Sequence, residues 1–125
     1  MSATKQALVV DDTEANRMLA ARLLGKAGWQ VHSVEDGAQA LAWLRLHCAA
    51  LVLLDISMPG LSGEEVCREV RCSGICGPAK LVAYTAHAMP EEKAQFMACG
   101  FDAVLTKPIS RASMHDMLTV LGLSS

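Results

Sequence analysis

Five polar side chains with chemical potential stand at the ends of apolar runs in this chain of 125 residues. They are Asp11 and Asp12, Asp55, Thr85 and Lys107. Carboxylates that gather in one place repel one another, and some stay protonated unless a cation offsets their charge. Oxygen ligands of this kind suit Mg²⁺, which binds through one or two carboxylates together with phosphate oxygens. A lysine and a hydroxyl nearby are suited to a transferred phosphoryl group.

The runs that carry these residues alternate with helical patterns. Such alternation favours β-α-β units and a parallel sheet. The expected strands are Gln6–Val10, Gln30–Val34, Leu51–Leu54, Lys80–Thr85 and Ala103–Thr106. The expected helices are Ala15–Ala27, Asp36–His47, Ser62–Cys72, Pro90–Gly100 and Ser110–Leu121. The caps at Asp36, Ser62 and Ser110 support these helix starts.

The pattern predicts an α/β fold of five β-α units. Right-handed crossovers place helices on both faces of the sheet. The strand order used by five-stranded, doubly wound folds is 2-1-3-4-5. In that order the carboxyl ends of the first and third strands meet at the switch point, where ligands bind in open α/β sheets. The five polar residues are therefore expected in one small region.

Four motifs, each at the end of an expected strand, resemble those of two-component receiver domains, the CheY-like family. They are Val9-Val10-Asp11-Asp12, Leu53-Leu54-Asp55-Ile56-Ser57-Met58-Pro59-Gly60, Thr85-Ala86-His87 and Leu105-Thr106-Lys107-Pro108-Ile109. The resemblance extends over the whole chain and implies a flavodoxin-like fold. It indicates a single receiver domain, residues 1–125, with a core of about 6–121.

The resemblance implies a phosphoacceptor and a metal site. Asp55 would accept a phosphoryl group from a phosphohistidine of a histidine kinase or a histidine phosphotransfer protein. Mg²⁺ would be the cofactor, bound directly by Asp12, mainly through water by Asp11, and by Asp55 itself. The backbone carbonyl of Ser57 would complete the site.

The resemblance also assigns the residues around the phosphate. Thr85 and the backbone N–H of Ala86 would hold phosphate oxygens, and Lys107 would pair with their charge. The Lys107–Pro108 bond is expected to be cis. Many receivers carry a Tyr or Phe three residues before the lysine, where this chain has Val104. Valine has no ring to move, so the response is expected in the segment 86–90 instead.

Three other functions remain open. Haloacid-dehalogenase-like phosphohydrolases need a second Asp two residues after the nucleophile, where this chain has Ser57. A redox or nucleotide-binding module is disfavoured because both glycine-rich phosphate motifs are missing and aromatic content is only 4%. A phosphorylation-independent interaction module would not need the complete set of site residues. The domain alone is not expected to be a kinase, although it would catalyse its own phosphotransfer and dephosphorylation.

Composition limits the other possibilities. The net charge of −2 gives no basic patch for nucleic acid. No apolar run approaches membrane-spanning length and the start does not resemble a signal peptide, so a cytoplasmic location is expected. Five cysteines without a Cys-x-x-Cys pair indicate small free thiols rather than a zinc site. The segments Asp12–Arg17 and Thr85–Met89 resemble receivers attached to hybrid sensor histidine kinases.

Overall fold

The strand Leu51–Asp55 (β3) is buried along its whole length and lies in the middle of the sheet. Its alternate side chains enter two cores, because Leu51 and Leu53 pack in one cluster and Val52 and Leu54 in the other. A run that is apolar at every position suits a central parallel strand covered on both faces. The computed structural model describes residues 5–58, 60–75, 79–86 and 89–123.

The sheet has the predicted topology. Five parallel strands lie in the order β2-β1-β3-β4-β5. The other four strands are β1 (Gln6–Val10), β2 (Gln30–Val34), β4 (Lys80–Thr85) and β5 (Ala103–Thr106). The register pairs Val10 with Leu54, and Asp55 with Tyr84. The carboxyl ends of β1, β3 and β4 therefore stand at one level.

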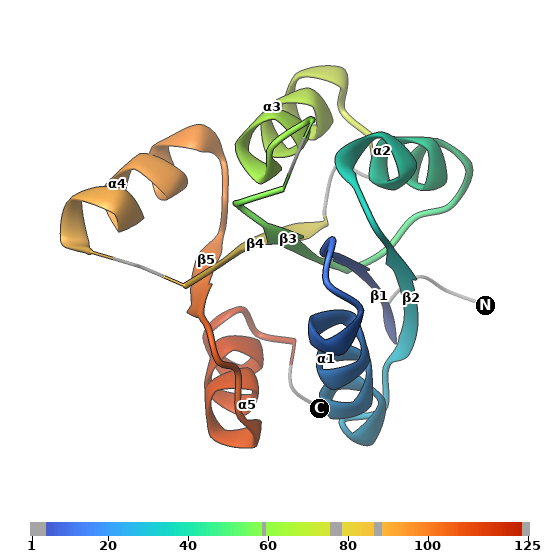
Figure 1. Cartoon of the computed structure of the whole chain (residues 1–125), viewed down its shortest axis with the longest axis vertical. Helices are drawn as coiled ribbons and strands as arrows, with labels where there is room; N and C mark the ends of the chain where they lie inside the picture. Colours follow the sequence, from blue (N-terminus) through green and yellow to red (C-terminus); the bar gives the residue numbers. More distant parts are fainter. Residues whose placement is uncertain (1–4, 59, 76–78, 87–88, 124–125) are drawn as a thin grey trace.

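Helices cover both faces of the sheet, as expected (Figure 1). They are α1 (Glu14–Lys26), α2 (Gly37–Leu46), α3 (Gly63–Ser73), α4 (Pro90–Cys99) and α5 (Arg111–Val120). The helices α1 and α5 cover one face, while α2, α3 and α4 cover the other. Each helix end lies within one residue of its expected position, and most of the differences are capping residues that stand just outside the helix. The doubly wound, flavodoxin-like fold is confirmed.

The expected caps form where the sequence placed them. The Asp36 side chain accepts a hydrogen bond from the backbone N–H of Gln39 at 2.8 Å. Ser62 and Glu65 form a reciprocal capping box, with each side chain bonded to the other residue's backbone. These bonds satisfy backbone donors that the first turn of a helix leaves without partners. The Lys107–Pro108 bond is cis, as expected.

One expectation about the cysteines is wrong. Cys48 is disulfide-bonded, whereas Cys67, Cys72 and Cys99 are free thiols. The spacing of cysteines in sequence could not reveal this bond, because pairing depends on which loops the fold brings together. Among the residues described, every helix is too short or too polar to cross a bilayer.

Candidate functional site

Asp55 is the last residue of β3, and only 2% of its surface is exposed. Its Oδ1 accepts a hydrogen bond from the backbone N–H of Ser57 at 3.1 Å. The same oxygen accepts a second hydrogen bond from Lys107 Nζ at 3.2 Å. Both hydrogen bonds therefore end on Oδ1 and hold the carboxylate in place, and neither involves Oδ2.

Asp11 is also buried, one residue beyond the end of β1. Its Oδ1 accepts a hydrogen bond from the backbone N–H of Thr13 at 2.8 Å, and its backbone carbonyl accepts one from Arg17 Nη1, also at 2.8 Å. Its Oδ2 is buried without a hydrogen-bond partner among the described residues. Burial raises the pKa of Asp11, and the nearby charge of Asp55 raises it further.

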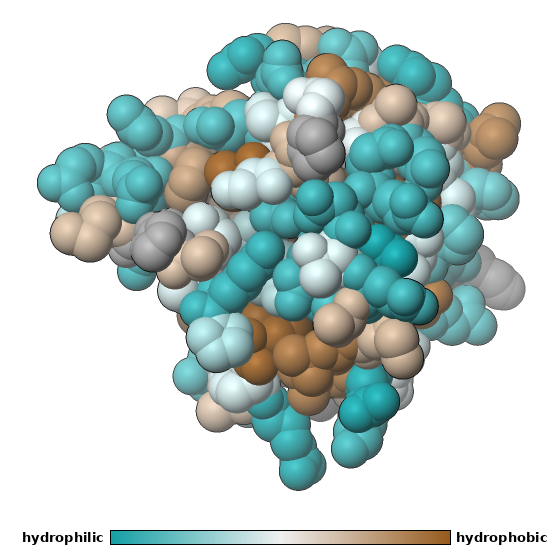
Figure 2. Space-filling model, viewed as in Figure 1, coloured by the Kyte–Doolittle hydropathy of each residue, from teal (hydrophilic) through white to brown (hydrophobic). Residues whose placement is uncertain are grey.

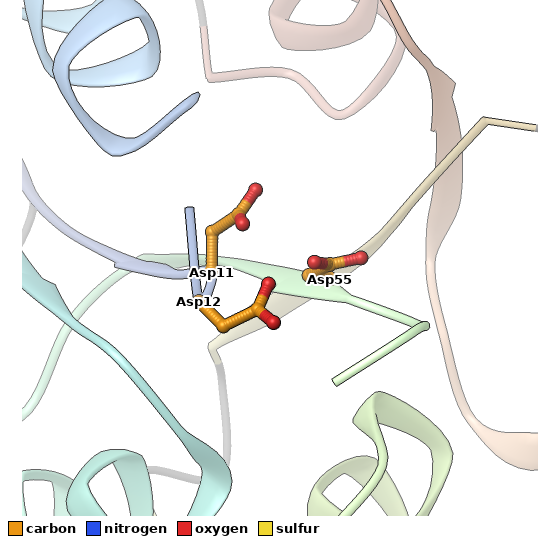
Figure 3. A group of neighbouring side chains, drawn as sticks. All are labelled: Asp11, Asp12 and Asp55. Atoms are coloured by element: carbon orange, nitrogen blue, oxygen red, sulfur yellow. The ribbon is translucent and has the colours of Figure 1, made fainter. Parts of the chain in front are cut away.

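The two buried acids lie beside exposed Asp12. One carboxylate oxygen from each of the three residues lies within 4.8 Å of the others. Figure 3 shows the three carboxylates together, at the ends of β1 and β3. Oxygens bound to one Mg²⁺ at about 2.1 Å are at most roughly 4.2 Å apart. A group of this size can surround one Mg²⁺, with each carboxylate binding the ion directly or through a water molecule.

The residues present therefore fit a divalent cation. The buried Oδ2 of Asp11 has no hydrogen-bond partner in the part of the chain that the structure describes, and burying a charged oxygen without one is costly. The donors are all oxygens, which suits a hard ion such as Mg²⁺. Exposed Asp12 leaves the group open to solvent on one side. An ion can therefore enter while keeping several of its waters.

Lys107 lies between the two buried acids, one residue after β5. Its Nζ is 3.2 Å from Asp55 Oδ1 and 3.7 Å from Asp11 Oδ2. It also stands 4.7 Å above the centre of the Tyr84 ring. An ammonium over an aromatic face is attracted by the ring's quadrupole, so the Tyr84 ring stabilises the charge of Lys107 through a cation–π contact. Burial, together with the charges of Asp11 and Asp55, raises the pKa of Tyr84 to about 12.

The remaining expected site residues stand at the same edge of the sheet. Thr85 ends β4 and is buried, and its backbone carbonyl accepts the Lys107 N–H at 2.7 Å. Ala86 follows it and is exposed. Ser57 is exposed two residues after Asp55. All the residues singled out in the sequence therefore come from strand ends that meet at the switch point.

Gly63, the first residue of α3, packs against the backbone that carries Asp55. A Cβ added at Gly63 would lie 2.5 Å from the carbonyl oxygen of Asp55 and 3.2 Å from the Cα of Ile56. No flexible side chain stands between them, so a methyl group can fit only if the helix or the strand end moves. Gly63 thus sets how closely α3 approaches the site.

We expect Gly63→Ala to lower the free energy of unfolding by about 1–3 kcal/mol, because overpacking a tight contact displaces backbone. Urea denaturation will measure this change. Gly25→Ala is the matched control, because Gly25 lies in α1 and nothing stands within 4 Å of its added Cβ. The free energy of unfolding of Gly25→Ala should rise by roughly 0.5–1 kcal/mol, because alanine has a higher helix propensity than glycine. Equal effects in both variants would contradict the close approach of α3.

Three residues at the site were not found from the sequence: Arg17, Gly63 and Tyr84. Tyr84 could have been placed on the side of Asp55 only with the register between β3 and β4. Gly63 gave a weak signal, because a glycine in a first helical turn has poor propensity and needs some other reason. Arg17 gave none, because a basic residue in α1 reads as solvated.

The site is a polar region rather than a large cavity. Figure 2 shows hydrophilic residues across the middle of the face, and a hydrophobic patch between α1 and α5. A groove of about 510 Å³ lies elsewhere, between α4, β5 and α5. Val104 lines that groove and is partly buried. The expectation that the segment 86–90 carries the response stays a prediction, and residues 87–88 lie outside the described residues.

Fold and site together define a CheY-like α/β domain with an acidic centre. The chain resembles the chemotaxis response regulator CheY4 of Vibrio cholerae at a TM-score of 0.86, with 27% identity over 93% of this chain and 97% of that one. It also resembles the receiver domain of the sensor histidine kinase PA1611 from Pseudomonas aeruginosa, solved with magnesium in its active-site cleft. That match has a TM-score of 0.83 and 26% identity, and covers 94% of this chain and 98% of the other.

Residues 7–119 match the response regulator receiver domain family, and the chain belongs to it. Among curated relatives, the sensor histidine kinase RcsC of Salmonella typhi is 36% identical over 90% of this chain and 12% of its own length. The sensor histidine kinase GacS of Pseudomonas protegens is 37% identical over 94% of this chain and 13% of its own length. The chain thus spans about an eighth of the length of these relatives.

Proposed function

We propose that this receiver domain takes a phosphoryl group from a phosphohistidine onto Asp55, with Mg²⁺ as the cofactor. The observation that carries the proposal is the meeting of three carboxylates within 4.8 Å of one another, with Lys107 Nζ 3.2 Å from Asp55. An acidic group with one fixed cation suits a ligand that brings both a divalent ion and a multiply charged anion.

The chain's own residues suggest the course of the transfer. A carboxylate oxygen of Asp55 forms the new bond to phosphorus, while the bond from phosphorus to the donor imidazole breaks. Lys107 already contacts Asp55 and is placed to pair with a phosphate oxygen there. We assign the hydroxyl of Thr85 and the backbone N–H of Ala86 to the other oxygens. A bound Mg²⁺ would offset the charge of the acids and of the incoming phosphate.

In this proposal the Mg²⁺ ligands are Asp11, Asp12, Asp55 and the backbone carbonyl of Ser57. The partner is a histidine kinase or a histidine phosphotransfer protein. The relatives that match this chain are much longer sensor kinases, and this supports a receiver that works within or beside such a kinase. A single domain over residues 1–125 and a cytoplasmic location stay predictions.

Acetyl phosphate separates this function from its alternatives. With Mg²⁺, the wild-type protein should gain one phosphoryl group, seen by intact mass spectrometry, and the gain should disappear when EDTA removes the metal. A redox module or a phosphorylation-independent interaction module would gain nothing. Lack of any phosphoryl adduct under conditions that load a known receiver would contradict the proposal.

Mg²⁺ affinity should depend more on Asp12 than on Asp11. Asp12→Ala should weaken binding the more, because the exposed carboxylate is proposed as the direct ligand and Asp11 as one acting through water. Titration of tryptophan fluorescence or of NMR shifts with Mg²⁺ will measure both affinities. Asp36→Ala, an acid that caps α2, is the control and should bind as the wild type does. Equal affinity in all variants would refute the assignment.

The same titration should depend on pH. Because burial raises the pKa of Asp11, its proton competes with the metal over a wider part of the acid range than for an ordinary aspartate. Mg²⁺ affinity should therefore rise as the pH is increased from acidic to neutral values, as expected when ligands must be deprotonated.

A further inference from the structure

Two free thiols meet where the end of α4 packs on α3. Cys67, in α3, has its Sγ 3.8 Å from the backbone carbonyl oxygen of Cys99, the last residue of α4. In return, Cys99 Sγ lies 3.6 Å from the carbonyl oxygen of Glu64, one turn before Cys67. Each sulfur therefore lies against the backbone of the other helix, and the two thiols are neighbours at the interface of α3 and α4.

The two thiols differ in access. Cys67 is fully buried, whereas Cys99 is partly exposed. Burial, followed by the neighbouring Cys99, raises the pKa of Cys67 to about 12. The thiolate is the reactive form of cysteine, so Cys67 is protected from direct attack. A soluble oxidant reaches Cys99 first.

We propose that Cys67 and Cys99 are a redox pair, which a hydroperoxide converts into an intramolecular disulfide between α3 and α4. In the first step the Cys99 sulfur takes one oxygen from hydrogen peroxide, giving a sulfenic acid and releasing water. In the second step the Cys67 sulfur attacks the Cys99 sulfur, and the hydroxyl leaves with the Cys67 proton as a second water. Two thiols are thereby oxidised and one peroxide is reduced.

The surrounding contacts hold the pair in place. Arg71, one turn after Cys67, donates from Nε to the carbonyl oxygen of Gly100 at 3.0 Å, and from Nη2 to Asp102 Oδ2 at 2.6 Å. A Cβ added at Gly100 would lie 3.4 Å from Cys67 Sγ. Arg71 thus binds the turn that follows Cys99 to α3. A disulfide would fix the carboxyl end of α4 to α3, and so restrain the helix that follows the segment after Thr85.

Peptide mapping tests the pair directly. The folded protein is treated with hydrogen peroxide, free thiols are blocked with iodoacetamide, and the chain is digested with trypsin and a glutamate-specific protease. This digest separates Cys67, in Val66–Arg68, from Cys48, and leaves Cys99 in Ala94–Arg111. We expect a species that joins these two peptides, lighter than their sum by two hydrogen atoms and released by dithiothreitol.

Cys72→Ser is the matched control, because Cys72 is an exposed free thiol on the same helix. That variant should still form the cross-link, and Cys67→Ala should lose it and retain a Cys99 sulfenic acid that dimedone captures. Circular dichroism checks that each variant is folded, and peroxide treatment in urea should remove the preference for this pair. A Cys99 cross-linked to Cys72, a Cys99 oxidised alone in the wild type, or unreacted thiols would each overturn the proposal.

Discussion

Asp55→Asn should abolish phosphorylation by acetyl phosphate and Mg²⁺, while the wild type gains one phosphoryl group. The amide keeps the size and shape of the side chain but removes the nucleophilic carboxylate. The oxygen that accepts from Ser57 and Lys107 can be kept by the amide carbonyl, so the local backbone should hold. The loss should be complete rather than partial, because no other oxygen in the assignment forms the bond to phosphorus. Intact mass spectrometry measures the outcome.

The matched control for this variant is Asp116→Asn, an exposed aspartate on α5 in the groove beside β5. It changes the net charge by the same amount, so it should take up the phosphoryl group as the wild type does. A phosphoryl adduct on Asp55→Asn would move the acceptor elsewhere. Fragmentation of the phosphorylated wild type, after reduction of the acyl phosphate with borohydride, should locate the modified residue at Asp55.

Much of this fold could be predicted from the sequence because each local signal agreed with the next. The run Leu51–Leu54 is apolar at every position, which suits a central strand covered on both faces. The caps at Asp36 and Ser62 are short-range hydrogen bonds, and these depend on neighbours three residues away rather than on the tertiary fold. Strand order then followed from the rules on crossovers.

The grouping of Asp11, Asp55 and Lys107 could be predicted for the same reason, because parallel strands bring their carboxyl ends to one edge. The residues around this group could not be predicted from the sequence. The position of Tyr84 beneath Lys107 depends on the register of β4. The facing of Cys67 and Cys99 depends on how α3 and α4 are rotated against each other. The disulfide of Cys48 depends on loop geometry, which carries no periodic signal.

Lys107→Ala should lower the free energy of unfolding at neutral pH by about 1–3 kcal/mol when no Mg²⁺ is present. Removing one partner of a buried ion pair costs roughly 3–5 kcal/mol, because the other charge is left without compensation. Here two buried carboxylates lose their cation, but the lysine side chain is 22% exposed, so solvent screening reduces the effect. Urea denaturation measures the change. Lys93→Ala, an exposed lysine on α4, should stay within about 0.5 kcal/mol of the wild type.

The difference in free energy of unfolding between Lys107→Ala and the wild type should become smaller as the pH is lowered. The pKa of Asp11 is already raised in the folded protein, and Lys107 lowers it, so the variant raises it further. A carboxyl with a raised pKa binds its proton more tightly when folded, and so the folded state gains stability as the pH falls through that pKa. Mg²⁺ should also reduce this difference at neutral pH. An ion that binds only the folded protein stabilises it. This stabilisation should be larger in Lys107→Ala, because the lysine no longer competes with the ion for the carboxylates. If neither low pH nor Mg²⁺ reduces the difference in unfolding free energy between Lys107→Ala and the wild type, the lysine stabilises the fold through packing on Tyr84 rather than through its charge.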